Sequence, residues 1–290
     1  MFVNPPPATV LPKGASVIAI AEDDDRVRFA RPDSLPGVPK SPAADADAKT
    51  RMRILMIGWS AMGRSALKAM APFLHVGSSV VVAVREEFVP ASARSDSTVS
   101  GIDMRFSALS EDVRDLDRLI DEMTPDEVIV LGYRDKISIA DADAMTMLTM
   151  LHVGSHLQRI GRSHTPVIAE VLDMRRTELA KQTSAVDLVV SDELGARMIS
   201  QLAENPSLAP VFHDLFSADG ATINVVPATR YVSVGTELSY LEFVLAARER
   251  GESAIGYRAA ATGTVRLNPP KSERLAVAEG DSLIVVGNLM

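Results

Sequence analysis

Short apolar runs alternate with helix-like segments from residue 53 to residue 190, and this alternation limits the possible folds more than any other feature. The predicted strands lie at residues 53–57, 79–84, 102–107, 126–132, 166–171 and 186–190. The predicted helices lie near residues 62–72, 111–122, 138–161 and 174–182. Repeated strand–helix units favour a parallel sheet with helices on both faces. We therefore expect an α/β fold with a Rossmann-like sheet at residues 51–190.

The pattern changes after residue 190. Two helical segments, at 192–204 and 210–217, are separated by "NPSLAP", whose prolines break a helix. Beyond them the sequence predicts one helix near 238–250 and short strands near 221–226, 230–234, 253–259, 263–267 and 282–287. We expect a helix–turn–helix crossover at residues 191–218 and a smaller α+β C-terminal lobe at residues 219–290.

The N-terminal part contains one strand-like run at residues 17–21, which ends in acidic residues. Residues 31–50 carry four prolines and no aromatic residue, which is typical of a linker. Residues 1–30 are too few to fold alone, so they must pack on something else. Their "LPKGASVIAIAE" echoes the closing "VAEGDSLIVVGN", which indicates the final strand of a preceding copy of the same lobe.

Composition excludes several classes of function. The net charge of −8 argues against a nucleic-acid surface, which needs clustered positive charge. The chain has no cysteine, so disulfides, thiolate metal sites and cysteine nucleophiles are excluded, and a reducing cytoplasm is the simplest location. No apolar run approaches the length of a membrane span, and the N-terminus does not resemble a secretory signal.

The turn in "RILMIGWSAMGRSAL" (53–67) resembles a dinucleotide-binding loop in part. Gly58 and Gly63 occupy the first and third positions of G-x-G-x-x-G, but Ser60 replaces the glycine that lets the backbone approach a pyrophosphate. Arg64 adds a positive charge at the helix start, and Glu86, after the next strand, could hold a ribose. These residues are the candidate nucleotide site, and the alternative is a Rossmann-like turn that binds no nucleotide.

The sequence gives less support to two other kinds of site, a hydrolase nucleophile and a zinc site. Ser60 could be a hydrolase nucleophile, but Met62 stands where the elbow needs its second glycine, and no histidine has the context of a partner. His152 and His156 share a helix face and could form half of a zinc site, but no third ligand is evident. No convincing catalytic set remains, so we expect a protein that is not an enzyme.

Acidic clusters suggest calcium instead. Glu170 and Asp173 lie at the end of a buried strand, where ligands of parallel sheets collect, and Asp23 and Asp24 follow the N-terminal strand. Such carboxylates could bind Ca²⁺ through oxygens from several segments. The acids that precede helices, Asp141, Asp192 and Glu193, are better explained as caps.

The crossover carries apolar residues at helical spacing, namely Leu194, Met198, Ile199 and Leu202. A helix pair bounded by prolines between two lobes is suited to pairing with another protomer. We therefore expect a homo-oligomer through these helices, with packing inside one chain as the alternative.

The order of several stretches resembles the cytosolic region of CASTOR/POLLUX-type ion channels, which carries RCK (TrkA-like) domains. These stretches include "ILMIGWS", "DEVIVLGYRD", "VIAEVLDMR", "VVSDELGARMISQLAENP", "VFHDLFSADGATINVVPA", "LNPPKSERL" and "EGDSLIVVG". The N-terminal "GASVIAIAEDDD" resembles the end of a preceding RCK domain. The resemblance covers nearly the whole chain except the linker.

The resemblance implies a regulatory module of a gating ring on the cytosolic face of a membrane channel. It would sense a ligand, with calcium favoured over NAD, and couple binding to a transmembrane pore in a longer chain or a partner. The alternatives are an NAD(P)-binding oxidoreductase, a soluble nucleotide sensor or an oligomeric scaffold without a ligand.

Overall fold

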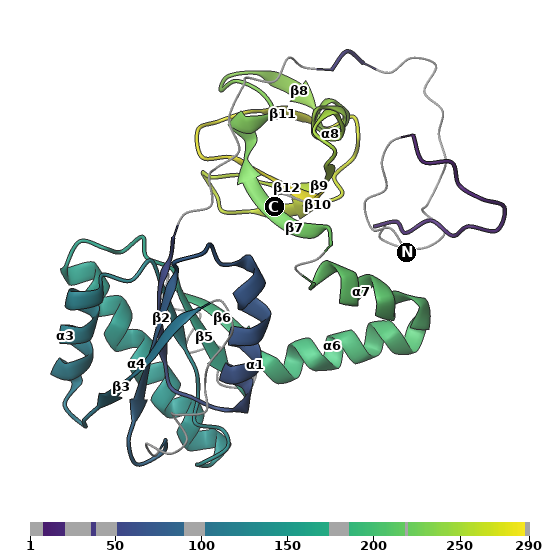
Figure 1. The fold of residues 1–290 in the computed structure, drawn as a ribbon. Helices are drawn as coiled ribbons and strands as arrows, with labels where there is room; N and C mark the ends of the chain where they lie inside the picture. The colour runs from purple at the N-terminus through teal and green to yellow at the C-terminus, as the bar shows by residue number, and fades with distance from the viewer. Residues whose placement is uncertain are drawn as a thin grey trace. The chain divides into compact units, whose positions relative to one another are not determined.

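The computed structural model describes residues 8–20, 36–38, 51–89, 102–173, 186–217 and 220–287. The chain divides into two compact units, one of residues 49–206 and one of residues 1–48 with 207–290 (Figure 1). The division falls inside the predicted crossover. Among the described helices, none has the length and apolar character needed to span a bilayer.

The unit of residues 49–206 is built on a six-stranded sheet with the order β3–β2–β1–β4–β5–β6. Its strands are β1 (Arg53–Ile57), β2 (Ser79–Arg85), β3 (Asp103–Leu109), β4 (Glu127–Val130), β5 (Val167–Val171) and β6 (Val186–Val190). Every neighbouring pair is parallel, so the predicted Rossmann-like fold class is confirmed. The strand order reverses between β1 and β4, and their carboxyl ends are where such sheets bind ligands.

Helices cover both faces of this sheet (Figure 1). On one face, α1 (Ala61–Met70) buries Leu67 against Ile54 and Met56 of β1, and η2 (Ala71–Phe73) follows it. On the other face lie α3 (Val113–Met123) and α4 (Ile139–Arg159). Their apolar positions form the core there, at Leu116, Leu119, Ile120, Met123, Met150, Val153 and Leu157. The helix predicted near residues 174–182 lies outside the described residues.

The crossover consists of α6 (Ser191–Glu204), η4 (Pro206–Leu208) and α7 (Ala209–Leu215). α6 begins directly after β6 and ends at Glu204, with Asn205 as its C-cap in front of the proline that the sequence indicated. No residue of α6 is buried. An amphipathic helix of a globular protein usually buries its apolar stripe, whereas the apolar stripe of α6 is left unburied.

The small lobe, residues 220–287, contains a four-stranded sheet with the order β10–β9–β12–β7 and a two-stranded pair, β11–β8. Its elements are β7 (Thr222–Pro227), η5 (Ala228–Arg230), β8 (Glu237–Ser239), α8 (Tyr240–Glu249), β9 (Ser253–Arg258), β10 (Val265–Leu267), β11 (Arg274–Ala276) and β12 (Ser282–Gly287). α8 starts with a capping box between Ser239 and Glu242, which satisfies amides of its first turn. This agrees with the predicted α+β lobe.

Two predicted strands are wrong. Residues 230–234 form no strand, because Tyr231 and Val232 enter the core of the lobe directly after η5, and Tyr231 donates a hydrogen bond to the buried Glu252. The described part of the N-terminal run also forms no strand: Val17 and Ile18 are about half exposed, without a paired strand in the described ranges. Within the described residues, the side-chain amide of Asn268 donates a hydrogen bond to the carbonyl oxygen of Ile20 at 2.7 Å.

Candidate ligand site at the carboxyl end of the parallel sheet

A cavity of about 220 Å³ lies at the carboxyl end of the sheet, where β1, β2, β3 and β4 end beside α3 and α4. Most of its wall is apolar, from Ile57, Leu109, Leu116, Val130, Leu131, Met145 and Leu148. Polar groups come from Arg85, Ser110, Glu111, Asp112, Tyr133, Thr146, Thr149 and His152. The Thr146 hydroxyl is buried and has no hydrogen-bond partner in the described structure. An apolar cavity with few polar groups at the switch point is the expected form of a ligand site.

Gly58 lines this cavity and is required by the backbone. Its φ is +88°, a conformation that favours glycine, and a Cβ there would lie 2.1 Å from the carbonyl oxygen of Leu131. The first glycine of the turn therefore allows β1 to end against β4. It serves the fold whether or not a ligand is bound.

The rest of the turn is used to cap α1. Ser60 is buried, and its hydroxyl accepts a hydrogen bond from the amide of Gly63 at 3.4 Å. The amide of Ala61 donates to the carboxylate of Asp135 at 2.8 Å. A Cβ on Gly63 would lie 2.9 Å from a methyl group of Leu131, so this glycine lets α1 approach the strand. Ser60 is thus a helix cap, which weakens its interpretation as a hydrolase nucleophile.

The other predicted nucleotide residues stand away from the described cavity wall. Arg64 is half-buried in the first turn of α1, and Glu86 is exposed in the turn after β2. The residue before it, Arg85, does line the cavity, and its backbone amide donates to the Tyr133 hydroxyl at 3.0 Å. Burial raises the pKa of this hydroxyl, so it stays protonated. The cation beside the cavity is therefore Arg85, which the sequence had not singled out.

Glu170 is 5% exposed at the end of β5, but it is already paired. Its Oε1 accepts from Arg134 Nη1 at 2.8 Å and from Ser191 Oγ at 2.7 Å. Its Oε2 is buried without a hydrogen-bond partner among the described residues. The second predicted acid, Asp173, is half-buried, and its amide donates to Asp143 at 2.9 Å. Glu170 thus joins the loop after β4 to the first residue of α6.

These acids do not form a calcium site as they stand. Within the described ranges, no group of three or more His, Asp or Glu side chains is placed to hold a metal ion. Ca²⁺ takes about six to eight oxygen ligands, and one oxygen of Glu170 already faces a guanidinium. Asp23 and Asp24 lie outside the described residues. The described carboxylates therefore do not fit the predicted ion.

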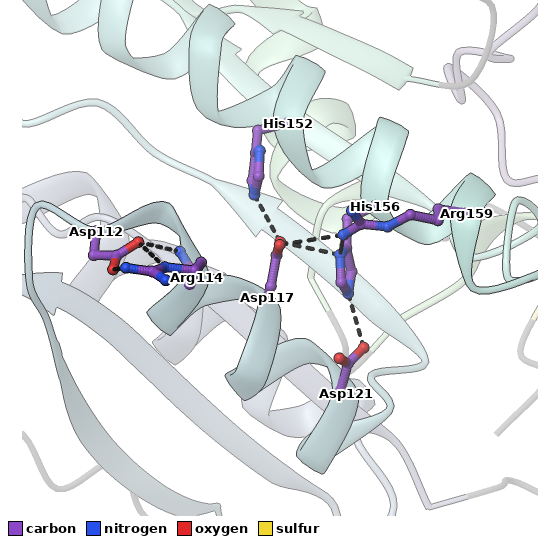
Figure 2. Close-up of polar contacts among 7 residues, drawn as sticks. All are labelled: Asp112, Arg114, Asp117, Asp121, His152, His156 and Arg159. Atoms are coloured by element: carbon purple, nitrogen blue, oxygen red, sulfur yellow. Dashed lines mark hydrogen bonds and ion pairs between the residues drawn. The ribbon is translucent and has the colours of Figure 1, made fainter.

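His152 and His156 do share a face of α4, and they meet two carboxylates of α3 (Figure 2). Asp117 accepts from His152 Nε2 at 2.7 Å and lies 3.0 Å from His156 Nδ1. His156 Nε2 lies 2.8 Å from Asp121. Arg159 bonds to Asp117 at 3.2 Å and contacts His156 Nδ1. We call these five residues the α3–α4 cluster.

The α3–α4 cluster is a network of hydrogen bonds and ion pairs between two helices. Burial acts to raise the pKa of Asp117, but hydrogen bonds and charges from His152, His156 and Arg159 outweigh it, and the pKa falls below its ordinary value of 3.8. Two carboxylates, Asp117 and Asp121, thus face two imidazoles and one guanidinium across the two helices. Since His152 also lines the cavity, this network borders the candidate site.

The sequence held a signal for this cluster. Asp117 and Asp121 are four residues apart on one predicted helix, as His152 and His156 are on another. Two residues four apart on one helix can contact two residues four apart on a neighbouring helix. The spacing of His152 and His156 taken alone predicts only half of a metal site.

Known proteins with similar sequences include plant ion channels. No known family profile matches the sequence. The probable ion channel CASTOR of Oryza sativa subsp. japonica is 27% identical over 99% of this chain and 36% of its own length. The ion channels CASTOR and POLLUX of Lotus japonicus are each 26% identical over 99% of the chain. The predicted resemblance to the CASTOR/POLLUX channels is confirmed. This chain spans roughly a third of the length of those CASTOR and POLLUX proteins.

Solved structures give weaker likenesses. The GsuK RCK domain has 18% sequence identity and a TM-score of 0.38 over 81% of this chain and 44% of its own. The structure titled "GsuK channel bound to NAD" has 18% identity and a TM-score of 0.39 over 83% of this chain and 37% of its own. Likenesses of this size say nothing about what the cavity of this CASTOR/POLLUX-like chain binds.

Proposed function

We propose that this chain is the RCK-type regulatory module of an ion channel, which senses a ligand and transmits the binding event to a pore rather than catalysing a reaction. The observation that carries the proposal is the similarity to CASTOR and POLLUX channels along 99% of the chain. The pore would belong to the rest of a longer channel or to a partner chain. In this proposal the module lies at the cytosolic face of a membrane.

We propose that the ligand occupies the cavity at the carboxyl end of the sheet, and that Glu170 connects this site to the crossover. Tyr133 lines the cavity, and the next residue, Arg134, binds Glu170. Glu170 in turn accepts from Ser191, the first residue of α6. A ligand that moves the loop after β4 would therefore shift the start of α6. Ligand binding can move such an equilibrium only by its differential affinity for the two arrangements.

We propose further that α6 pairs with a second copy of the chain. Leu194 and Ile199 are 53% and 70% exposed, while Met198 and Leu202 are half-buried. Pairing through α6 would remove this apolar surface from water, which stabilises an oligomer by about 25 cal/mol for each Å² buried.

Replacing Leu194 and Ile199 together by aspartate should therefore convert an oligomer into monomers. Light scattering coupled to gel filtration would measure the mass. Val76→Asp is the matched control, because Val76 is 82% exposed on the same unit outside the crossover, and its variant should keep the wild-type mass. A double variant that also keeps that mass would contradict pairing through α6.

A thermal melt with Ca²⁺, Mg²⁺ or NADH tests ligand sensing. A ligand at a hundred times its dissociation constant adds about 2.7 kcal/mol to the folded state, which raises the melting temperature by a few degrees. A rise with Ca²⁺ alone would support the calcium sensor that the sequence suggested. A rise with NADH would favour the second candidate, a nucleotide sensor or NAD(P)-binding enzyme, because Gly58 lines the cavity at the nucleotide position of such folds.

A further inference from the structure

The amino-terminal end of α1 is where a ligand phosphate binds in folds of this kind. The first amides of a helix have no partner within the helix, and the helix dipole favours negative charge there. In this chain two of these amides already have acceptors. Ala61 donates to Asp135 at 2.8 Å, and Gly63 donates to the Ser60 hydroxyl at 3.4 Å.

Asp135 is held in place by its neighbours in the chain. The amides of Lys136 and Ile137 donate to the carbonyl oxygen of Tyr133 at 2.8 and 3.2 Å, which closes a tight turn around Asp135. Tyr133 is 5% exposed, and Arg134 is bound to the buried Glu170. The carboxylate is therefore presented to α1 by an anchored loop, so a competing anion would have to displace it.

The surroundings of the cavity also disfavour a polyanion. Ser60 fills the position where a glycine would let a pyrophosphate approach, and its side chain is buried. Glu111 and Asp112 are the acidic residues that line the described cavity, and the Asp112 carboxylate is paired with Arg114. The cation in that wall, Arg85, lies 3.6 Å from Glu87. By contrast, the buried and unpartnered Thr146 hydroxyl can hydrogen-bond an uncharged group within the apolar part.

We propose that Asp135 occupies the position of a ligand phosphate, so that the cavity accepts small, largely apolar ligands without a diphosphate and excludes dinucleotides. This inference rests on the proposed function, since it assigns a ligand class to the same cavity. The Asp135 carboxylate accepts the hydrogen bond from the first turn of α1 that a ligand phosphate would otherwise accept. The charge repulsion between this carboxylate and an incoming diphosphate is what excludes dinucleotides.

The test compares the wild type with Asp135→Asn and Asp135→Ala in thermal melts with ADP, NADH, inorganic pyrophosphate and adenosine. The wild type should show no shift with the diphosphates. Both variants should gain a rise of a few degrees with ADP and pyrophosphate, and none with adenosine. Asp103→Asn is the control, because it makes the same change of net charge at the exposed amino end of β3 and should behave as the wild type.

Three outcomes would overturn the inference. One is a wild type that binds ADP or NADH. Another is a pair of folded Asp135 variants that bind no diphosphate, since Asp135 would then not be the barrier. The third is an equal rise in the melting temperature of the variants with adenosine and with ADP, which would show that they recognise the nucleoside rather than the diphosphate. Calorimetric titration with ADP repeats the comparison if one variant melts too early for a thermal assay. None of these outcomes affects the pairing of α6, which tests the regulatory role separately.

Discussion

Replacing Gly58 by alanine should unfold the parallel-sheet unit or leave it barely stable. The new Cβ would lie 2.1 Å from the carbonyl oxygen of Leu131, a backbone atom that cannot move without breaking the contact of β1 with β4. A positive φ at a residue with a Cβ costs about 1–2 kcal/mol, and the clash adds to it, so we expect a loss above about 4 kcal/mol. Domains are stable by only about 5–15 kcal/mol.

Urea unfolding followed by the fluorescence of Trp59 measures this loss. The chain has a single tryptophan, Trp59, which is 8% exposed next to the turn, so its signal reports this unit. The matched control is Gly154→Ala within α4, where a Cβ would meet nothing within 4 Å. Since alanine favours helix over glycine, the control should gain up to about 1 kcal/mol. Equal midpoints for the two variants would refute the structural role of Gly58.

Replacing Asp117 by asparagine should destabilise the same unit by about 2–3 kcal/mol. The carboxylate lies among His152, His156 and Arg159. An amide keeps one acceptor oxygen, but its NH2 group would face a donor on the other side, and the guanidinium would lose its charge partner. Removing one member of a buried ion pair costs about 3–5 kcal/mol, and we expect less because the Asp117 side chain is 19% exposed. Glu122→Gln, on the exposed face of α3, should change stability by less than about 0.5 kcal/mol.

The loss of stability caused by Asp117→Asn should disappear in acid. Its pKa is lower in the folded state than its ordinary value of 3.8, so its contribution is fully present above that value and is lost as the pH falls through the lower, folded pKa. The difference in unfolding free energy between wild type and Asp117→Asn should therefore be complete at about pH 5 and close as the pH falls below 3.8. A difference that persists unchanged in strong acid would show that packing, rather than charge, is responsible.

The sequence alone determined the parts of this protein that depend on local pattern. Apolar runs of strand length, separated by helical periodicity, predicted β1 to β6 and the parallel sheet. Pro206 and Pro210 located the break in the crossover, because proline is excluded from a helix interior but fits the first turn: Pro206 follows the end of α6, and Pro210 lies in the first turn of α7. The spacing of Gly58 and Gly63 after an apolar run marked them as turn residues, although the atoms that exclude a Cβ at both positions belong to the distant Leu131.

Tertiary structure decided which distant groups meet. Asp135 reaches the amide of Ala61 across 74 positions, Arg134 reaches Glu170 across 36, and Asp117 meets His152 across 35. Periodicity assigns a residue to a face of its own helix or strand but says nothing about the partner opposite that face. That choice is made when α1, α3, α4 and the strand ends pack around one sheet. For this reason the sequence could indicate a nucleotide turn and calcium-binding acids, which stay predictions, but it could not indicate that Asp135 accepts from the amide of Ala61 or that Glu170 pairs with Arg134.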